Sequence, residues 1–484
     1  MGRADDTGRI PTNIPHADEV LNGGLLPRSA VLVRGTPGAG KTIFGLHVLA
    51  GGDGTDLYIN LGEPATYLRE TAEQFGLDIG HVECLDRSAS SAAFTQDSTY
   101  DLFHSGEVEN SSLVDAVREE VTETEPDRVL IDPITELRYL TPDEHQFREQ
   151  VLGLLDFLKG EGATVVLTSQ AAPSVPDDDL QFLVDAVLTL RNNAGRRTVE
   201  VSKFRGSATR DGQHGVTITG DGMCVWPRLD PSRHDRPGSV ETLSSGVDAL
   251  DDLLGGGLTT GTMTFLSGPT GVGKTTTGLQ FVTAAANNGT RAVVYSFEED
   301  RRTMLDRATA LGMGLHDLSG AGQVTIRDIG PGDITIDEFT RQVRRAVEED
   351  DAGVVMIDGV TGYERAFETE NTTQQLVNIG RYLRNMNVTG LVTNEVHHIT
   401  GEFRVTEQEM SHLADSIVVL RHVEYRGELR KVIGVLKMRT QSFEHRLRRF
   451  EITEQGLVVG EPLSNLRGIL TGTPDWVGEQ KDSP

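Results

Sequence analysis

The feature that most limits how this chain can fold is a glycine-rich loop that occurs twice, each time directly after a run of apolar residues. The first copy begins at Gly35 and the second at Gly268, and both match the pattern GxxxxGK[ST]. In this pattern the glycines let successive backbone N–H groups surround a phosphate at the start of a helix, and the lysine reaches the β- and γ-phosphates. We therefore expect two ATP-binding loops, formed by Gly35, Thr36, Pro37, Gly38, Ala39, Gly40, Lys41 and Thr42 and by Gly268, Pro269, Thr270, Gly271, Val272, Gly273, Lys274, Thr275 and Thr276.

The surroundings of the two loops are repeated as well. The segment VSKFR at 201–205 returns as VLKMR at 435–439, at nearly the spacing that separates the loops. Each half alternates short Val- and Ile-rich runs with helix-length segments, which is typical of a parallel sheet covered on both faces. The sequence thus predicts an α/β fold of two tandem RecA-like P-loop domains, each a mostly parallel sheet flanked by helices and ending in antiparallel hairpin strands. The expected boundaries are 1–226 for the first domain, 227–238 for a linker with three prolines, and 239–484 for the second domain.

Length and charge narrow the class of protein further. A chain of 484 residues is long enough for two cores, no apolar run approaches the ~18 residues of a membrane span, and the first residues lack the apolar stretch of a secretory signal. The two cysteines, Cys84 and Cys224, have no metal-ligand spacing, so we expect a cytoplasmic protein without a disulfide framework or zinc site.

The net charge of −28 with only seven lysines favours a halophilic cytosol, although an ordinary acidic protein is the alternative. An acidic surface repels phosphate backbones, so nucleic-acid binding is disfavoured.

Carboxylates end two of the apolar runs that we expect beside the loops. Asp132 ends RVLID and Asp358 ends VVMID. A carboxylate at the tip of a strand beside a P-loop strand holds Mg²⁺ through water, and the loop hydroxyl, here of Thr42 or Thr275, binds the ion directly. We therefore expect ATP and Mg²⁺ as cofactors at both sites. The alternative for each aspartate is a turn at the end of a strand.

A pair of glutamates follows one strand but not its counterpart. Glu298 and Glu299 follow AVVYSF, whereas the first half has Gly62 and Glu63 at the same place. In ATPases of this type a glutamate here orients or deprotonates the attacking water or hydroxyl. We therefore expect the first domain to hydrolyse ATP slowly or mainly to bind it. Solvated glutamates favoured by a helix dipole are the alternative.

Two lysine–arginine pairs recur at the ends of the repeated segments. Lys203 with Arg205, and Lys437 with Arg439, are cations at positions i and i+2 of an expected strand, and hence on one face of it. Such a pair could reach the γ-phosphate held by a neighbouring subunit, as an arginine finger does. The alternative is ordinary surface charge on a strand.

Together, the paired loops, the glutamate pair and the Lys-x-Arg pairs resemble the KaiC family, the double-domain clock ATPases of the RecA superfamily. The resemblance covers nearly the whole chain and is strongest in HVEYRGELRKVIGVLKMR, LRRFEITEQGL and ILTGTP near the C-terminal end. It implies a homohexamer of stacked rings with ATP at the subunit interfaces. It also implies an ATPase ring from the first domain and a serine/threonine autokinase ring from the second, which together serve signalling or timing and have protein partners.

The same resemblance points to a phosphoacceptor. Ser411 occupies the position of the family's acceptor serine, while His412 replaces the adjacent threonine, so one of two acceptors is missing. A serine that caps a helix is the alternative interpretation of Ser411.

Two other classes of function share this fold. One is a DNA-associated motor or recombination accessory protein, which the acidic charge and the lack of a recognisable DNA-binding module oppose. The other is a nucleotide-gated scaffold with little turnover, which Gly62 supports. The leading expectation is a KaiC-like ATPase and serine/threonine autokinase.

Overall fold

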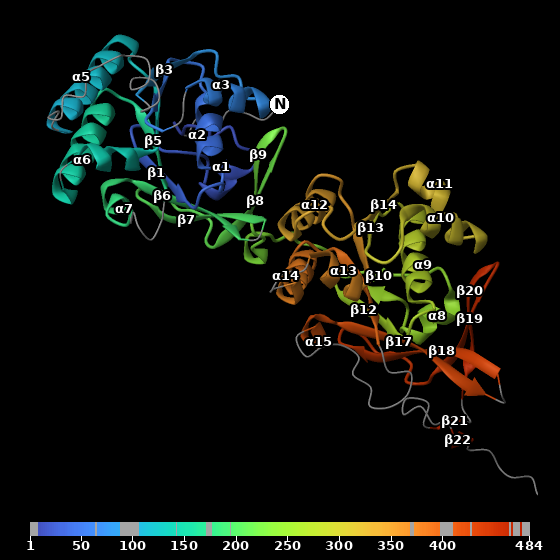
Figure 1. Ribbon diagram of the computed structural model, residues 1–484. Coiled ribbons are helices and arrows are strands. Elements are labelled where there is room, and N and C mark those ends of the chain that lie inside the picture. The colour runs from blue at the N-terminus through green and yellow to red at the C-terminus, as the bar shows by residue number, and fades with distance from the viewer. Residues whose placement is uncertain are drawn as a thin grey trace, which may run out of the picture. The chain divides into compact units, whose positions relative to one another are not determined.

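The chain folds into two compact units that divide after Arg228 (Figure 1). The computed structural model describes residues 8–62, 65–87, 106–141, 143–170, 177–193, 195–367, 372–396, 410–425, 428–463, 466–467 and 475–476. No helix within this described part is both long and apolar enough to cross a membrane.

The first domain is built on one nine-stranded sheet. Its strands, in spatial order, are β3 (Val82–Asp86), β2 (Asp56–Asn60), β4 (Arg128–Asp132), β5 (Thr164–Gln170), β1 (Ala30–Gly35), β6 (Ala186–Asn193), β7 (Arg196–Phe204), β8 (Gln213–Thr219) and β9 (Gly222–Trp226). Strands β3 to β6 pair in parallel, and β6 to β9 pair antiparallel. The carboxyl ends of the parallel strands therefore meet along one edge, where such sheets bind their ligands.

Helices cover both faces of this sheet. One apolar cluster joins the strands to α5 (Gly106–Thr124), η1 (Ile134–Leu140) and α6 (Glu144–Gly160), and the other joins them to α1 (Ala17–Val20) and α2 (Lys41–Ala50). The helices α3 (Ala65–Gln74) and α7 (Leu180–Leu183) complete the domain. Because both faces are buried, the central strands are continuous apolar runs, as in RVLID.

The second domain repeats this order strand for strand. The sheet runs β14 (Val324–Asp328), β13 (Ala292–Ser296), β15 (Val354–Asp358), β16 (Thr389–Glu395), β12 (Met263–Gly268), β17 (Ser416–Tyr425), β18 (Glu428–Met438), β19 (Arg448–Thr453) and β20 (Gly456–Pro462). The short strands β10 (Thr242–Leu243) and β11 (Leu258–Thr259) pair with each other, as do β21 (Leu466–Arg467) and β22 (Asp475–Trp476). The two sheets confirm the predicted α/β class, with two mostly parallel sheets flanked by helices.

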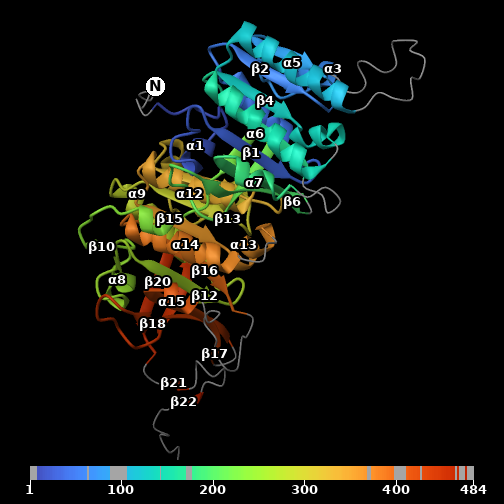
Figure 2. The same ribbon diagram turned by 90° about the vertical axis from the view of Figure 1, so that its left-hand side faces the viewer.

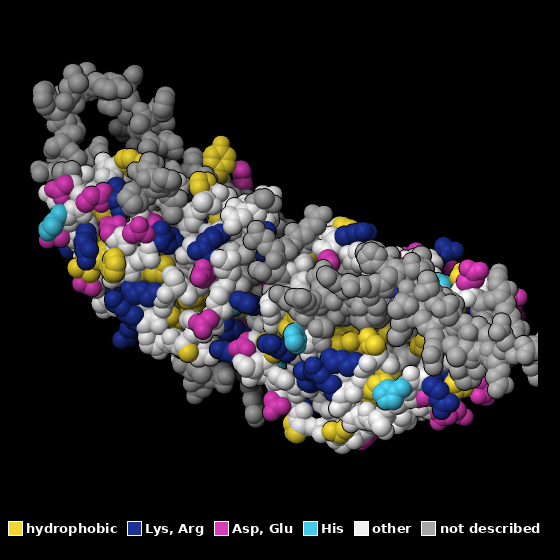
Figure 3. Space-filling model, turned by 90° about the horizontal axis from the view of Figure 1, so that it is seen from below, with side chains coloured by type: hydrophobic (Ala, Val, Ile, Leu, Met, Phe, Trp, Pro, Cys, Tyr) yellow, Lys and Arg dark blue, Asp and Glu magenta, His cyan; other side chains and the backbone are white. Residues whose placement is uncertain are grey.

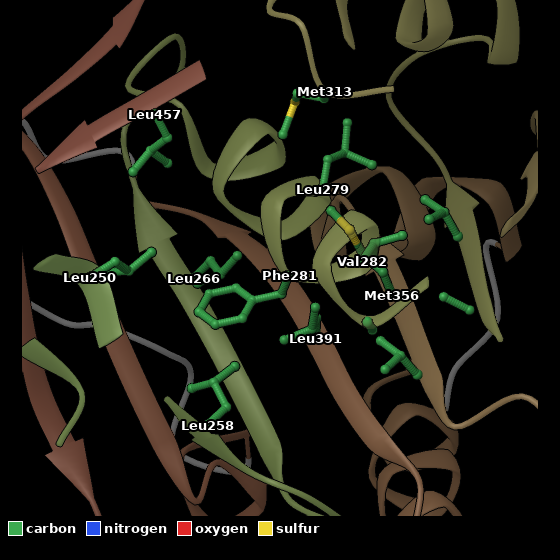
Figure 4. Close-up of a cluster of buried hydrophobic side chains, with 14 of the residues drawn as sticks. Leu250, Leu258, Leu266, Leu279, Phe281, Val282, Met313, Met356, Leu391 and Leu457 are labelled. Atoms are coloured by element: carbon green, nitrogen blue, oxygen red, sulfur yellow. The ribbon is translucent and has the colours of Figure 1, made fainter. Parts of the chain in front are cut away.

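Two helical layers also enclose the second sheet. On one face lie α8 (Asp248–Leu253), α9 (Lys274–Asn287), α10 (Arg301–Ala310) and α11 (Leu315–Gly320), and on the other lie α12 (Ile336–Glu348), α13 (Val360–Phe367) and α14 (Thr372–Asn385) (Figures 1 and 2). Figure 4 shows Leu279 and Val282 of α9 among Leu266, Met356 and Leu391 from three strands. The helix that follows the P-loop is thus packed directly on the strands that carry the site.

Most of the segment predicted as a linker packs on the second domain. Leu229 belongs to its core, and η2 (Pro231–Arg233) contacts α14 through a bond from Asn385 Nδ2 to Pro231 O of 2.8 Å. His234 stacks edge-on against Tyr382 and pairs with Glu348 at 3.2 Å. The proline-rich composition therefore marks a chain segment that is ordered by the domain it precedes.

Candidate functional sites

Both predicted loops join a strand to a helix as P-loops do. Gly40 and Gly273 precede α2 and α9 with φ of 102° and 113°, in the left-handed region that glycine adopts without strain. A Cβ on Gly40 would lie 2.7 Å from Ile218 Cδ1, and one on Gly273 would lie 2.6 Å from Ile452 Cδ1. Glycine is therefore required here both by the turn and by the hairpin strand that covers it.

The loop lysines lie over their own loops. Lys41 Nζ donates to Gly35 O and Thr36 O at 3.0 and 3.1 Å, and Lys274 Nζ donates to Pro269 O at 3.1 Å. Burial lowers the pKa of both ammonium groups, while nearby carboxylates raise it, Asp132 in the first domain and Glu298 foremost in the second. Each cation is thus held at the mouth of the loop, in the position from which a P-loop lysine reaches phosphates.

Asp358 has the surroundings of a carboxylate that binds Mg²⁺ through water. It ends β15, and its Oδ1 accepts hydrogen bonds from Thr275 Oγ1 at 2.9 Å and Thr393 Oγ1 at 2.8 Å. Its Oδ2 is buried and has no hydrogen-bonding partner among the described residues. Burial raises the pKa of Asp358, so a cation beside it would relieve the cost of its charge.

This donor set fits Mg²⁺ held jointly with a nucleotide. Within the described ranges, no group of three or more His, Cys, Asp or Glu side chains could hold a metal ion. Mg²⁺ in nucleotide sites binds through one or two protein oxygens and takes the rest of its shell from phosphates and water. Thr275 and Asp358 supply such oxygens side by side.

The two glutamates of the second domain have different surroundings. Glu299 forms an ion pair with Arg307 of α10 at 2.8 Å. Glu298 is half-buried, and burial first and Asp358 second raise the pKa of its carboxyl, which Lys274 lowers in part. Glu299 is thus held by an ion pair to Arg307, whereas Glu298 lies beside Asp358 and Lys274.

The glutamates and the loop line a single cavity of ≈ 540 Å³. Sequence reasoning missed three polar residues of its lining, Glu395, Arg307 and Lys431, and also Thr393, which donates to Asp358. Glu395 accepts from Thr270 Oγ1, and Lys431 Nζ donates to Gly271 O at 3.1 Å. Glu395 ends the apolar run GLVTNE beside the P-loop strand, and that position was the one signal in the sequence that could have identified it.

Glu298 has room because the next strand is followed by glycine. Gly359, directly after Asp358, has φ 98°, and a Cβ there would lie 2.5 Å from Glu298 Cγ. In the first domain the same two positions hold Gly62 and Pro133. A Cβ on Gly62 would lie 3.0 Å from Pro133 Cδ. The glutamate–glycine pair of one domain is thus matched by a glycine–proline pair in the other.

The carboxylate of the first site is bound differently. Asp132 Oδ1 accepts from Thr168 Oγ1, and Oδ2 accepts from the buried Tyr58 hydroxyl at 3.2 Å. Thr42 lies in the first turn of α2, as Thr275 does in α9. Glu63 lies outside the described residues. Tyr58 occupies the register position of Val294, and no pattern in the sequence predicted its contact with Asp132.

Each lysine–arginine pair lies at the end of a hairpin strand. Lys203 and Lys437 lie in β7 and β18, and Arg205 and Arg439 directly follow the last strand residues, Phe204 and Met438. Arg439 N–H donates to Asp415 O at 3.1 Å, which continues the register that pairs Met438 with Ser416. That the two cations of a pair share one face of the strand stays a prediction.

Neither pair faces the P-loop of its own domain. Ser416 is the register partner of Thr264, at the start of β12, and Lys437 pairs with Ile417. Gly268, where the P-loop begins, is at the other end of β12. The cations therefore lie at the opposite edge of the sheet from their own nucleotide loop.

Ser411 lies in α15 (Met410–Leu413), but its side chain is outside the described residues. The neighbouring His412 is exposed.

Comparison with known proteins agrees with this architecture. A family model described as "ATPase: KaiC" matches residues 10–230 and 243–464. The circadian clock protein KaiC3 of Synechocystis sp. is 27% identical, over 99% of this chain and 96% of its own. The circadian clock oscillator proteins KaiC of Acaryochloris marina and Prochlorococcus marinus strain MIT 9313 are each 28% identical, over 98% of this chain and 93% and 97% of their own.

Proposed function

The chain belongs to the KaiC family of ATPases, and from this premise we propose that it is a cytoplasmic ATPase and serine/threonine autokinase that acts in signalling or timing. In this proposal both domains bind ATP with Mg²⁺. The second domain transfers the γ-phosphoryl group, and the first binds ATP and hydrolyses it slowly.

The observation that carries the proposal is the position of Glu298. Its carboxyl lies in the cavity with the P-loop lysine and with Asp358, and Gly359 leaves the space for it. A carboxylate with a raised pKa beside a triphosphate site can take a proton from an attacking hydroxyl. The hydroxyl oxygen then bonds to the γ-phosphorus, the bond to the ADP oxygen breaks, and the proton remains on Glu298.

Mg²⁺ would be held by Thr275 and, through water, by Asp358, and it supplies neutralisation of the charge on the phosphates. The equivalent residues of the first site are Thr42 and Asp132. There Tyr58 and Thr168 occupy both oxygens of Asp132, and no glutamate stands at Gly62. These differences support a nucleotide site that stabilises the assembly more than it turns over.

The Lys-x-Arg pairs support a ring. Since each pair lies at the far edge of the sheet from its own P-loop, it does not reach the nucleotide of its own domain, which is consistent with a contact to a neighbouring subunit. We propose a homohexamer in which Lys203, Arg205, Lys437 and Arg439 reach the nucleotide of a neighbouring chain, with Ser411 as the phosphoacceptor and with further proteins as signalling partners.

Purified protein incubated with γ-labelled ATP tests the proposal. We expect label on the chain, and we expect Ser411→Ala to remove it while phosphate release continues. Phosphate release that DNA stimulates, with no labelling of the chain, would instead support a DNA-associated motor. Nucleotide binding without labelling or release would support a scaffold.

A matched pair of variants tests the role of Glu298. Glu298→Gln is expected to lower labelling by roughly 10²- to 10⁴-fold, the usual contribution of a positioned general base. Glu63→Gln, at the glutamate position of the first domain, is expected to have a smaller effect. Equal losses in the two variants would contradict the proposed division of labour between the domains.

A further inference from the structure

Each domain contains an aspartate directly before the strand next to its P-loop strand, partly buried in the first domain and buried in the second. We refer to Asp185 and Asp415 as the strand-start aspartates. Each aspartate bonds the first residue of the P-loop strand twice, once through its main chain and once through its carboxylate: Asp415 N–H donates to Met263 O at 2.9 Å, and Met263 N–H donates to Asp415 Oδ2 at 3.0 Å. Asp185 makes the same two bonds to Ala30, at 2.8 and 2.9 Å.

The strand-start aspartates also hold the cations of the Lys-x-Arg segments. Asp415 Oδ1 lies 3.9 Å from Arg439 Nη1, and its main-chain oxygen accepts from Arg439 N–H. Arg384, at the end of α14, pairs with Asp415 Oδ2 at 2.9 Å. In the first domain Arg205 and Lys159 lie 4.0 and 3.5 Å from Asp185. The same arrangement therefore occurs twice in sequences that differ in most side chains.

The cations fix the segment that precedes the aspartate. In the second domain they donate to three successive carbonyls, Arg439 to His412 O at 3.4 Å, Arg384 to Leu413 O at 3.0 Å and Lys437 to Ala414 O at 2.6 Å. In the first domain Lys203 donates to the carbonyls of Gln181 and Val184 at 2.6 and 2.7 Å. Hydrogen bonds to the main chain thus hold the ammonium and guanidinium groups in defined positions.

The charges around each aspartate do not cancel. One carboxylate faces two arginines and a lysine in the second domain, and two lysines and an arginine in the first. Burial lowers the pKa of Lys437, the neighbouring Arg439 lowers it further, and Asp415 raises it. The Arg205 and Arg439 side chains remain 60% and 48% exposed, so positive charge is offered to solvent. On the face seen in Figure 3, dark-blue Lys and Arg side chains gather in groups although the chain as a whole is acidic.

A single strand separates these cations from the P-loop of their own domain. Strand β12 runs from Met263, bound to Asp415, to Gly268, where the loop begins. At ~3.3 Å per residue the two ends are roughly 16 Å apart. A close-packed interior has low compressibility and transmits strain, so a displacement at one end of this strand can be felt at the other.

We propose that Asp185 and Asp415 are positioning residues, each of which ties the start of a P-loop strand to the cations that its subunit offers to the nucleotide of the next subunit. The inference rests on the proposed ring, and it names the part that connects one nucleotide site to the next. Nucleotide binding to a P-loop shifts its strand, the aspartate carries that shift to Arg439 or Arg205, and the neighbouring site gains or loses a positive charge.

Two variants each remove one part of a second-domain site, either the base of the subunit that binds the nucleotide or the cations of its neighbour. Asp415→Asn keeps the P-loop and Glu298 but loses the charge that holds Arg384 and Arg439. Glu298→Gln keeps the cations but loses the base. Each variant alone is expected to lower labelling of the chain by at least ~10-fold. The loss in Asp415→Asn is expected to be smaller than the ~10³-fold or more that removal of an arginine finger costs. An Asp415→Asn chain with normal labelling would overturn the inference.

The decisive measurement uses both chains co-expressed in equal amounts. A site with the Asp415→Asn P-loop and the cations of a Glu298→Gln neighbour is complete, so labelling is expected to recover toward about a quarter of wild type, because one neighbouring pair in four has this order in a ring. The chain with both substitutions gives the background. A purely structural role of Asp415 would spoil the site of its own chain, and mixing would restore nothing.

Arg439→Ala mixed with Glu298→Gln distinguishes this inference from the ring on which it rests. Recovery with Arg439→Ala but not with Asp415→Asn would overturn the role of the aspartate and leave the ring in place. No recovery with either variant would contradict both. Melting temperatures of the single variants show whether Asp415→Asn folds normally.

Discussion

At the scale of single residues, the difference between the two sites depends on the contact between two neighbouring strand ends. In the second domain Glu298 lies against Gly359, and in the first Gly62 lies against Pro133. A side chain can be added at Gly62 only if Pro133 gives way, since a Cβ there would already be 3.0 Å from the ring. The residue at position 62 or 298 therefore has to be considered together with the residue it contacts, at position 133 or 359.

This contact predicts that the two positions must change together. In a Lys274→Ala background, which removes the second site, Gly62→Glu alone is expected to leave ATP turnover nearly unchanged. Gly62→Glu with Pro133→Gly is expected to raise it by ~10-fold or more, because a positioned base contributes ~10²-fold or more. Phosphate release measures both. A single Gly62→Glu variant as active as the double one would contradict the steric argument.

The raised pKa of Glu298 predicts a pH dependence that the first site lacks. A protonated carboxyl cannot accept a proton, so kcat/KM of the second site falls as the pH drops through that pKa, which lies above the ordinary value of 4.5. The first site, with Gly62 in this place, is expected to lack this limb. pH–rate profiles in Lys41→Ala and Lys274→Ala backgrounds measure the two sites separately, and superimposable profiles would exclude Glu298 as the base.

At the scale of elements, a hairpin strand covers each P-loop, and the first domain ties its hairpin down with a histidine. His47 of α2 is buried, its Nδ1 lies 3.0 Å from Asn13 O, and its Nε2 accepts from Met223 N–H of β9 at 2.8 Å. Only a neutral ring can accept that bond. Gln280 holds the same place in α9 and donates to Ser245 O at 2.9 Å.

This bond predicts that the first domain loses stability in mild acid. Burial lowers the pKa of His47 below its ordinary 6.5 in the folded state, so the unfolded chain binds more protons between the two values. The free energy of unfolding therefore falls as the pH drops below 6.5 until the folded pKa is reached. His47→Gln, which copies the second domain, should flatten this dependence. Urea unfolding of the first domain at several pH values checks it, and an unchanged slope would count against His47.

At the scale of the whole chain, the dominant feature is its acidic charge. Both domains have the same strand order, and the chain that contains them carries a net charge of −28. Like charges at this density repel one another and destabilise the compact state when salt is low. The positive groups around the strand-start aspartates are local exceptions to this field.

This charge predicts stabilisation by salt. Raising KCl from ~0.1 to ~1 M shortens the Debye length from ~10 to ~3 Å, which screens repulsion between surface carboxylates. The melting temperature is therefore expected to rise with KCl, and an uncharged solute at equal osmolality should raise it less. A melting temperature that KCl leaves unchanged would contradict the interpretation of a protein adapted to high salt.

The sequence alone determined those parts of the molecule whose physics is local. A P-loop is made by consecutive residues, and a strand buried on both faces is one apolar run. The loops, the α/β class and the duplication could therefore be predicted from the order of residues in the sequence. Asp132 and Asp358 were placed for the same reason, since each ends such a run.

Other features depend on contacts between residues far apart in the chain. The room that Gly359 leaves for Glu298 and the hydrogen bond from Tyr58 to Asp132 required neighbouring strands to be in register. The cluster around Asp415 joins the ends of α14 and β18 to the start of β12. No pattern in the sequence specifies these contacts between distant residues, because packing distances and burial are set by the whole fold.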